Sequence, residues 1–122
     1  MPTLPHKDEE AAVSASHGAG GAVVLLAFDG VEAIDIAGPA SVFSKAEQMR
    51  PGTYRLHIAS PAGGSVPTNG GLSFAGTLAL RELPAAIDTL IVAGGDEPSV
   101  RSAILEQKVS EWIAEVAPRV RR

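Results

Sequence analysis

The chain has no cysteine among its 122 residues. No disulfide, thiol nucleophile or cysteine-ligated metal can therefore come from this sequence. Aromatic residues are also scarce, at 4%, so a core has to be built mainly from Ala, Val, Leu and Ile. With 45% hydrophobic and 20% charged residues, the composition is that of one globular domain of modest size.

Long apolar runs are missing as well. The longest, residues 22–28, is far shorter than the roughly 18 residues that a membrane-spanning helix needs. The first ten residues are polar and acidic and have neither the basic nor the apolar region of a secretory signal. We therefore expect a cytoplasmic protein without a membrane partner.

Positive charge is in deficit, and the formal net charge is −4. Surfaces that bind nucleic acid are normally basic, so we expect no nucleic-acid contact by this segment. The cluster Arg119, Arg121 and Arg122 is the local exception. We interpret it as basic residues that oppose the dipole at the C-terminal end of a helix.

Residues 1–21 show no hydrophobic period and are predicted to be a disordered tail. His6, Asp8 and His17 lie in this tail, but without a rigid frame to set the ligand geometry we expect no metal site there. No metal or cofactor is expected elsewhere. Residues 22–122 form the predicted domain.

The continuous apolar run of residues 22–28 predicts a strand that is buried on both faces, as in a parallel sheet, and residues 88–93 predict a second buried strand. Between them, residues 54–60 alternate between apolar and polar side chains, which predicts an edge strand. His57 lies on the polar face of this strand. We expect it to be a solvated histidine rather than a catalytic one.

Helices are predicted between and after the strands. One begins at Pro39, which suits a first helical turn, and continues to Met49. Two more are predicted near residues 98–105 and 108–117. Residues 65–74 predict a hairpin, because Asn69 and Gly70 both tolerate positive φ, and a short helix or turn is expected near residues 80–86.

This order of elements indicates βαβ units with right-handed crossovers. We predict an α/β fold with a flavodoxin-like, doubly wound parallel sheet, the first strand inside the sheet and the hairpin as a small insertion. Only three parallel strands are predicted, fewer than a complete domain of this kind has. We therefore expect a sheet that is incomplete at its C-terminal end.

Ligands of open α/β sheets bind beyond the carboxyl ends of the strands, where loops 29–39 and 94–98 are expected. Asp35 is either an N-cap or first-turn acid or a carboxylate that holds a proton near a reactive partner. Gly94 and Gly95 form either a tight turn or a backbone N–H cradle for an anion.

Residues 28–43 follow the pattern F-x-G-V-x-x-I-D-x-x-G-P-x-x-V-F. This pattern resembles the first βα unit of the ThiJ/PfpI superfamily (class I glutamine amidotransferase-like), in the variant found at the front of GlxA-type AraC transcription regulators. Later segments fit the family in order, and the resemblance covers about residues 22–122. The segments are 54–60, 63–66, 70–72 and 88–95.

The resemblance implies a flavodoxin-like fold and usually a dimer. In the family, an acid four residues before the proline, here Asp35, faces a nucleophilic Cys on a strand-to-helix elbow, and the amides at Gly94 and Gly95 help to form an oxyanion hole. We place Gly38 in the same ligand-binding set. The elbow is expected beyond Arg122, and the carboxylates of Asp96 and Glu97 depart from the more neutral turn of the family and would weaken an anion cradle.

Our leading hypothesis is a ligand-sensing module of an AraC-type transcriptional regulator. It would be a homodimer, would bind an unknown small-molecule effector, and would reach DNA only through a C-terminal domain absent from this chain. The alternative is a fragment of a ThiJ/PfpI-family enzyme, such as an isonitrile-hydratase-like hydrolase, in which Asp35 assists a Cys. A half-domain with only a structural or dimerising role is the third reading. We expect no catalysis by this chain alone.

Overall fold

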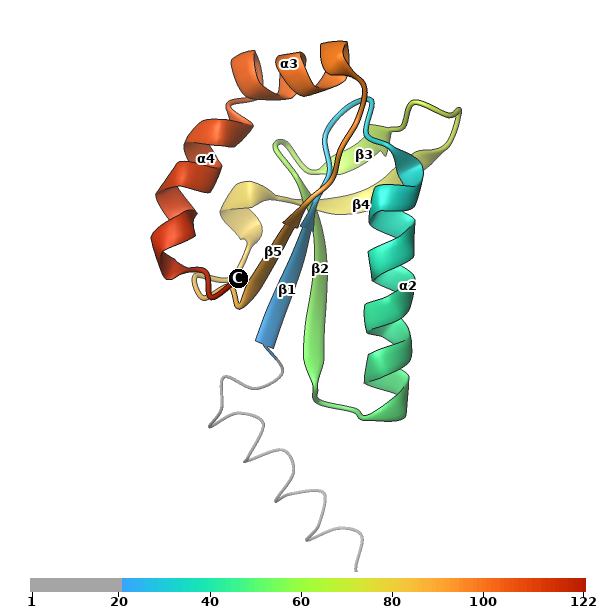
Figure 1. Ribbon diagram of the computed structural model, residues 1–122, viewed down its shortest axis with the longest axis vertical. Coiled ribbons are helices and arrows are strands. Elements are labelled where there is room, and N and C mark those ends of the chain that lie inside the picture. The colour runs from blue at the N-terminus through green and yellow to red at the C-terminus, as the bar shows by residue number, and fades with distance from the viewer. Residues whose placement is uncertain (1–20) are drawn as a thin grey trace, which may run out of the picture.

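A computed structural model describes residues 21–122 and shows a five-stranded sheet in the order β3-β4-β2-β1-β5. The sheet lies between helix α2 on one side and helix α4 on the other (Figure 1). The strands are β1 (Gly21–Leu26), β2 (Tyr54–Ser60), β3 (Gly64–Pro67), β4 (Ser73–Ala79) and β5 (Thr89–Val92). The helices are α2 (Ala33–Met49), α3 (Glu97–Leu105) and α4 (Val109–Val116), with short 3-10 turns η1 (Leu80–Glu82) and η2 (Ala117–Arg119).

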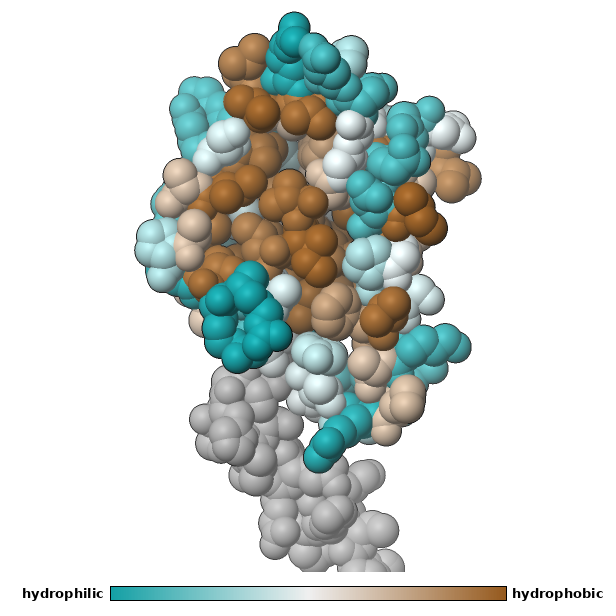
Figure 2. Space-filling model, viewed as in Figure 1, coloured by the Kyte–Doolittle hydropathy of each residue, from teal (hydrophilic) through white to brown (hydrophobic). Residues whose placement is uncertain are grey.

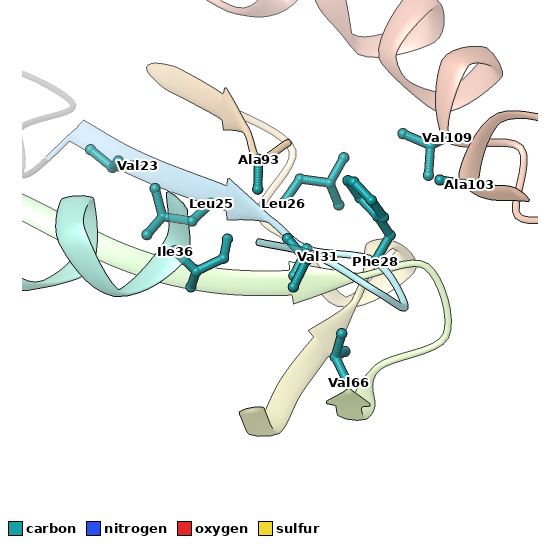
Figure 3. Packing of buried hydrophobic residues seen from close by; sticks show 11 residues of the cluster. Val23, Leu25, Leu26, Phe28, Val31, Ile36, Val66, Ala93, Ala103 and Val109 are labelled. Carbon is teal, nitrogen blue, oxygen red and sulfur yellow. The ribbon is translucent and has the colours of Figure 1, made fainter. Parts of the chain in front are cut away.

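Strand β1 lies inside the sheet, as predicted, and pairs in parallel with both β2 and β5. Its residues are apolar on both faces because each face is covered. On one side Leu25 lies beside Ile36 of α2, and on the other Phe28 is directed toward Ala103 and Val109 (Figure 3). The flavodoxin-like α/β architecture expected from the sequence is thus confirmed.

The prediction of an edge strand over residues 54–60 is wrong, because β2 lies between β1 and β4. Strand β4 pairs with β2 only at Ala59 and Ser60, however. Residues 54–58 therefore have a paired neighbour only on the β1 side, which explains why their sequence alternates like that of an edge strand.

The predicted hairpin is confirmed as β3 and β4, but it is not a mere insertion. Strand β4 runs on to pair in parallel with β2 and so becomes a fourth parallel strand of the main sheet. The glycine Gly76 (φ 70°) in β4 hid this strand, because glycine is disfavoured in strands. The expectation that Asn69 and Gly70 have positive φ is wrong. In this turn the residue with positive φ is Gly71, at 88°.

Helix α2 begins at Ala33, so Pro39 lies inside the helix and not in its first turn. Proline has no N–H, so the helix loses one backbone hydrogen bond at this position. In the last turn of α2, the carboxylate of Glu47 accepts hydrogen bonds from the N–H groups of Gly52 (2.7 Å) and Tyr54 (3.0 Å), which lie beyond the helix. These bonds lower the pKa of Glu47 and fix the turn into β2.

Helices α3 and α4 follow the predicted ranges closely. Helix α4 ends at Val116 and has no basic residue in its last turn. The interpretation of the C-terminal arginines as partners of a helix dipole is therefore wrong for Arg121 and Arg122, which lie beyond the helices. Arg119 lies in η2, and Arg121 forms an ion pair with Asp88.

Strand β5 forms one edge of the sheet, and Val92 is 43% exposed. Only its first residues have a neighbour on the outer side. Arg122 donates its N–H to Asp88 O (3.0 Å) and accepts the N–H of Leu90 (2.8 Å), which is the pattern of a parallel ladder. Apolar side chains gather over β5, between α2 and α4 (Figure 2).

The predicted tail, with His6, Asp8 and His17, lies outside the described residues apart from Gly21, which opens β1. Within residues 21–122, no helix is both long enough and apolar enough to cross a lipid bilayer.

Candidate functional site

The loops that follow β1 and β5 meet at the carboxyl edge of the sheet, as the sequence predicted. The N–H of Glu32 is donated to Gly94 O at 2.9 Å, and Val31 forms an isolated antiparallel bridge with Gly95. Two segments more than 60 residues apart along the chain are thereby joined through their backbones at the place where ligands bind in this class of fold.

Asp35 lies in the first turn of α2, and its Oδ2 accepts the N–H of Gly94 at 2.8 Å. A Cβ atom on Gly94 would lie 3.0 Å from the same oxygen, so the close approach favours glycine at that position. The carboxylate therefore ties the start of α2 to the end of β5. Within residues 21–122, the structure gives its Oδ1 no hydrogen-bond partner, which leaves that oxygen available to a ligand.

The glycine pair after β5 is tightly packed. The N–H of Gly94 is already used by Asp35, and a Cβ on Gly95 would lie 3.2 Å from both Gly30 O and Phe28 Cε1. An anion held at this turn would have to displace Asp35 or rely on the Gly95 amide. The pair thus acts as a close-packed turn in this structure, while its role in ligand binding stays a prediction.

The acidic residues after the glycines serve the next helix. Oδ1 of Asp96 accepts the N–H of Ser99 at 2.9 Å and so caps α3. This bond lowers the pKa of Asp96. Glu97 pairs with Arg101 one turn along the helix. Both carboxylates lie next to the Gly94–Gly95 turn in the chain, and Arg101 offsets the charge of Glu97. That the two carboxylates weaken an anion cradle stays a prediction.

Gly38 is a half-buried residue of α2. A Cβ at this position would meet nothing within 4 Å. No hydrogen bond joins it to the Gly94–Gly95 turn within the described part of the chain. The structure thus brings Asp35, Gly94 and Gly95 together and leaves Gly38 facing open space on the helix.

The tip of the β3–β4 hairpin also reaches this edge, which the sequence did not indicate. Asn69 donates its N–H to Val31 O (3.1 Å) and its Nδ2 to Glu32 Oε1 (3.0 Å). Gly30, in turn, donates its N–H to Pro67 O (2.9 Å). The hairpin turn is therefore bonded to the loop that precedes α2. The Asn-Gly pair predicts a turn. It does not predict the contact of Asn69 with Glu32, because the two residues are 37 positions apart in the sequence.

Gly30 connects the site to α3. Its φ is 85°, and a Cβ there would lie 2.0 Å from Ser99 Oγ. Any other residue would therefore meet both backbone strain and a steric clash. The loop after β1 is held by the hairpin on one side and by the N-terminal turn of α3 on the other.

His57 is not the solvated histidine that was expected. Its side chain is half-buried, and its Nε2 is buried without a hydrogen-bond partner in the described region. Burial, and to a lesser extent the charge of Arg55, lower its pKa below the usual value. It lines a cavity of about 330 Å³ beside Leu56 and Gly76, where β2 and β4 part. It is not among the residues that gather around Asp35.

Metal-ligating side chains do not cluster at this edge or elsewhere in residues 21–122. No group of three or more His, Cys, Asp or Glu residues in that range is placed to hold an ion. The arrangement consists of one anchored carboxylate, a glycine turn and a hairpin turn bonded to the loop after β1.

A mostly parallel sheet in the order β3-β4-β2-β1-β5, with β1 inside it and helices on both sides, defines a flavodoxin-like α/β domain. The family model described as DJ-1/PfpI matches residues 21–119. This chain belongs to the DJ-1/PfpI family.

Two solved structures share the fold. A ThiJ/PfpI family protein from Pseudomonas syringae superposes with a TM-score of 0.71 at 19% identity, over 83% of this chain and 39% of that chain. An AraC family transcriptional regulator from Pseudomonas putida gives 0.67 at 17% identity, over 81% and 51%. At these identities the likeness shows the fold alone.

A curated protein of Streptomyces lividans, described as an uncharacterized protein in the cpoL 5′ region, is 43% identical over 74 residues. The match covers 61% of this chain and 51% of that protein. The present chain thus matches about half of this relative's length.

Proposed function

We propose that this chain is a ligand-sensing DJ-1/PfpI module of an AraC-type transcriptional regulator, acting in the cytoplasm as a homodimer. DNA would be bound by a part of the regulator outside this chain. One observation carries the proposal: the Asp35 carboxylate is fixed on the Gly94 amide, in a chain without cysteine. The acid couples two structural elements and has no thiol from this chain to activate.

The geometry suggests how sensing would work. Asp35 belongs to α2, while Gly94 follows β5, so their hydrogen bond links a helix to the opposite part of the site. A small molecule that donates a hydrogen bond to Oδ2 of Asp35 would compete with the Gly94 N–H for that oxygen. Such a ligand would shift the position of α2 only to the extent that it binds the two arrangements differently.

The charge and the structural relatives support a regulatory role. A net charge of −4 suits a module that leaves DNA binding to another part of the protein, because phosphate neutralisation dominates DNA affinity. The likeness to the AraC family regulator supports the same assignment at the level of fold.

The alternative is a fragment of a ThiJ/PfpI-family enzyme, such as an isonitrile-hydratase-like hydrolase. A carboxylate at the carboxyl edge, where catalytic groups of such folds lie, favours it. A mechanism with a cysteine nucleophile, as the family resemblance implies, would need that nucleophile from another chain or segment, because this chain has no thiol. Turnover of an isonitrile or of methylglyoxal by the chain alone would favour the enzyme, and we expect none.

The test of sensing is a thermal-shift screen of the purified chain against a library of small metabolites. Compounds that bind at the site should raise the melting temperature of the wild type but not of Asp35→Asn. The matched control is Asp29→Asn, which alters an exposed carboxylate in the adjoining loop and should keep the response.

Two results would contradict the proposed function. One is turnover that is lost in Asp35→Asn, which would favour the enzyme. The other is salt-sensitive binding of duplex DNA by residues 1–122 in a gel-shift assay, which would place DNA recognition in this segment.

A further inference from the structure

A cavity of about 470 Å³ lies between the segment that follows β4 and helix α4. This volume is within the range of small-molecule sites. In Figure 1 the short turn after β4 lies beside α4, on the face of the sheet away from α2. Asp35, Gly94 and the hairpin turn do not line this cavity, so it is separate from the site at the carboxyl edge.

The floor of the cavity is apolar. Ile87 and Val116 are buried, and Trp112 is half-buried and packs against the cluster of Val24, Ala59 and Ile87. These side chains come from α4 and from the segment before β5, and they are held by contact with the sheet. An apolar group that entered would therefore meet a preformed surface.

The rim carries two guanidinium groups from separate turns. Arg81 belongs to η1 and Arg119 to η2. Neither side chain forms a hydrogen bond or an ion pair with another residue in the described range 21–122, whereas Arg101 and Arg121 are both paired. Glu115 also lines the cavity, so the charged lining groups are two cations and one anion.

We propose that this cavity binds an amphipathic carboxylate. An alkyl chain or ring would lie on Trp112 and Ile87, and the carboxylate would lie between Arg81 and Arg119. A guanidinium matches a carboxylate with two parallel N–H donors, and both guanidiniums are available. The apolar floor selects for a hydrophobic body, and the net positive rim selects for a single anionic head.

Trp112 is the only tryptophan of the chain and gives a direct reporter. Titration of the full chain with octanoate should give a saturable change in tryptophan fluorescence. 1-Octanol has the same chain length but no charge, and should bind about tenfold more weakly or worse, because it lacks the charge-assisted hydrogen bonds.

Four variants sharpen the test. Arg81→Gln and Arg119→Gln should each weaken octanoate binding about tenfold without changing 1-octanol binding. Glu115→Gln should tighten octanoate binding, a gain that misfolding would not produce. Arg50→Gln changes an exposed arginine at the end of α2 and should leave binding unchanged.

The proposal is overturned if octanoate gives no saturable response at millimolar concentrations. It is equally overturned if octanoate and 1-octanol bind alike, or if Arg50→Gln weakens binding as much as the two rim variants do. Because the cavity contains none of the residues around Asp35, these outcomes do not depend on the sensing role proposed for that site.

Discussion

The two edges of the sheet are built on different principles. Strand β3 is short, has a register shift between Gly64 and Val66, and ends at Pro67, all features that blunt an edge against further pairing. Strand β5 is apolar throughout its last three residues, and its Leu90 N–H faces outward to Arg122. One edge is closed by its own geometry, whereas the other is suited to accept a neighbour.

The largest difference should appear in self-association. We expect the chain to form dimers or larger species through β5, because the alternation of the strand turns the N–H of Val92 to the same open side as that of Leu90. The variant Val92→Lys should be monomeric, since it replaces exposed apolar surface on an open edge with a charge. Size-exclusion chromatography with light scattering over a range of concentrations measures this.

The matched control is Ser65→Lys, which adds the same charge to an exposed position of β3. It should leave the apparent mass unchanged. A wild-type chain that is monomeric at every concentration, or a Ser65→Lys variant that dissociates as fully as Val92→Lys, would remove the distinction between the two edges.

The next largest effect concerns the packing of strand β3 against the core. Val66 is 2% exposed and belongs to the main core cluster, so Val66→Ala should lower the free energy of unfolding by about 1–3 kcal/mol in a urea melt. Leu72→Ala, at a position 64% exposed, should change it by less than about 0.5 kcal/mol. Equal effects would show that the hairpin is held by its turn and not by the packing of Val66.

The gap between β2 and β4 predicts a smaller effect, on the pH dependence of stability. The pKa of His57 is lower in the folded chain than its ordinary value, so the unfolded state binds more protons as the pH falls. Its contribution to stability is full above the unfolded pKa and declines as the pH drops through the unfolded pKa toward the folded one. The variant His57→Gln should have a urea midpoint that changes less with pH between pH 8 and pH 5 than that of the wild type.

The control for this titration is a variant in which His6 and His17 are replaced, because these are the other two histidines of the chain. That variant should keep the wild-type slope. The role of His57 would be refuted if the pH dependence of the urea midpoint persisted in His57→Gln and vanished in the variant that lacks His6 and His17.

The smallest effect is expected where the chain end meets β5. Arg121 donates to Asp88 at 2.7 Å, which lowers the pKa of Asp88. The Arg121 side chain is 64% exposed and that of Asp88 26% exposed, so solvent reaches the pair and salt screens it. Asp88→Asn should cause a slight loss of stability that disappears in 1 M NaCl. Since the folded pKa is depressed, the contribution is present above the unfolded pKa and is lost as the pH falls through the folded one.

Much of the fold could be predicted from local patterns. The apolar runs located β1 and β5 in the parallel sheet, and the Asn-Gly pair located the hairpin. Burial on both faces was correctly predicted for β1 but wrongly for β5, which lies at an edge and has no fully buried residue. The continuation of β4 into the main sheet was missed because Gly76 and its small neighbours carry no strand signal. The start of α2 was misplaced because proline is commoner in a first turn than inside a helix.

The candidate site shows the same division. The topology alone could place Asp35, Gly94 and Gly95 at one edge of the sheet. In the structure, Oδ2 of Asp35 is 2.8 Å from the backbone nitrogen of Gly94. The cavity at Trp112 could not be predicted, because Arg81, Ile87 and Arg119 come from three separate segments. Their meeting depends on how the turn after β4 packs on α4, which no local pattern encodes.

The backbone pairing of Arg122 with β5 affects where a tag can be attached to the protein. Because it lies opposite Thr89 in a parallel ladder, any residues fused after it would be guided along the open edge of β5. By this register, the fourth added residue would lie opposite Ala93, immediately before the Gly94 that binds Asp35. An affinity tag or reporter at the C-terminus is therefore not neutral: it would occupy the open edge and approach the ligand site, so labels belong at the other end of the chain.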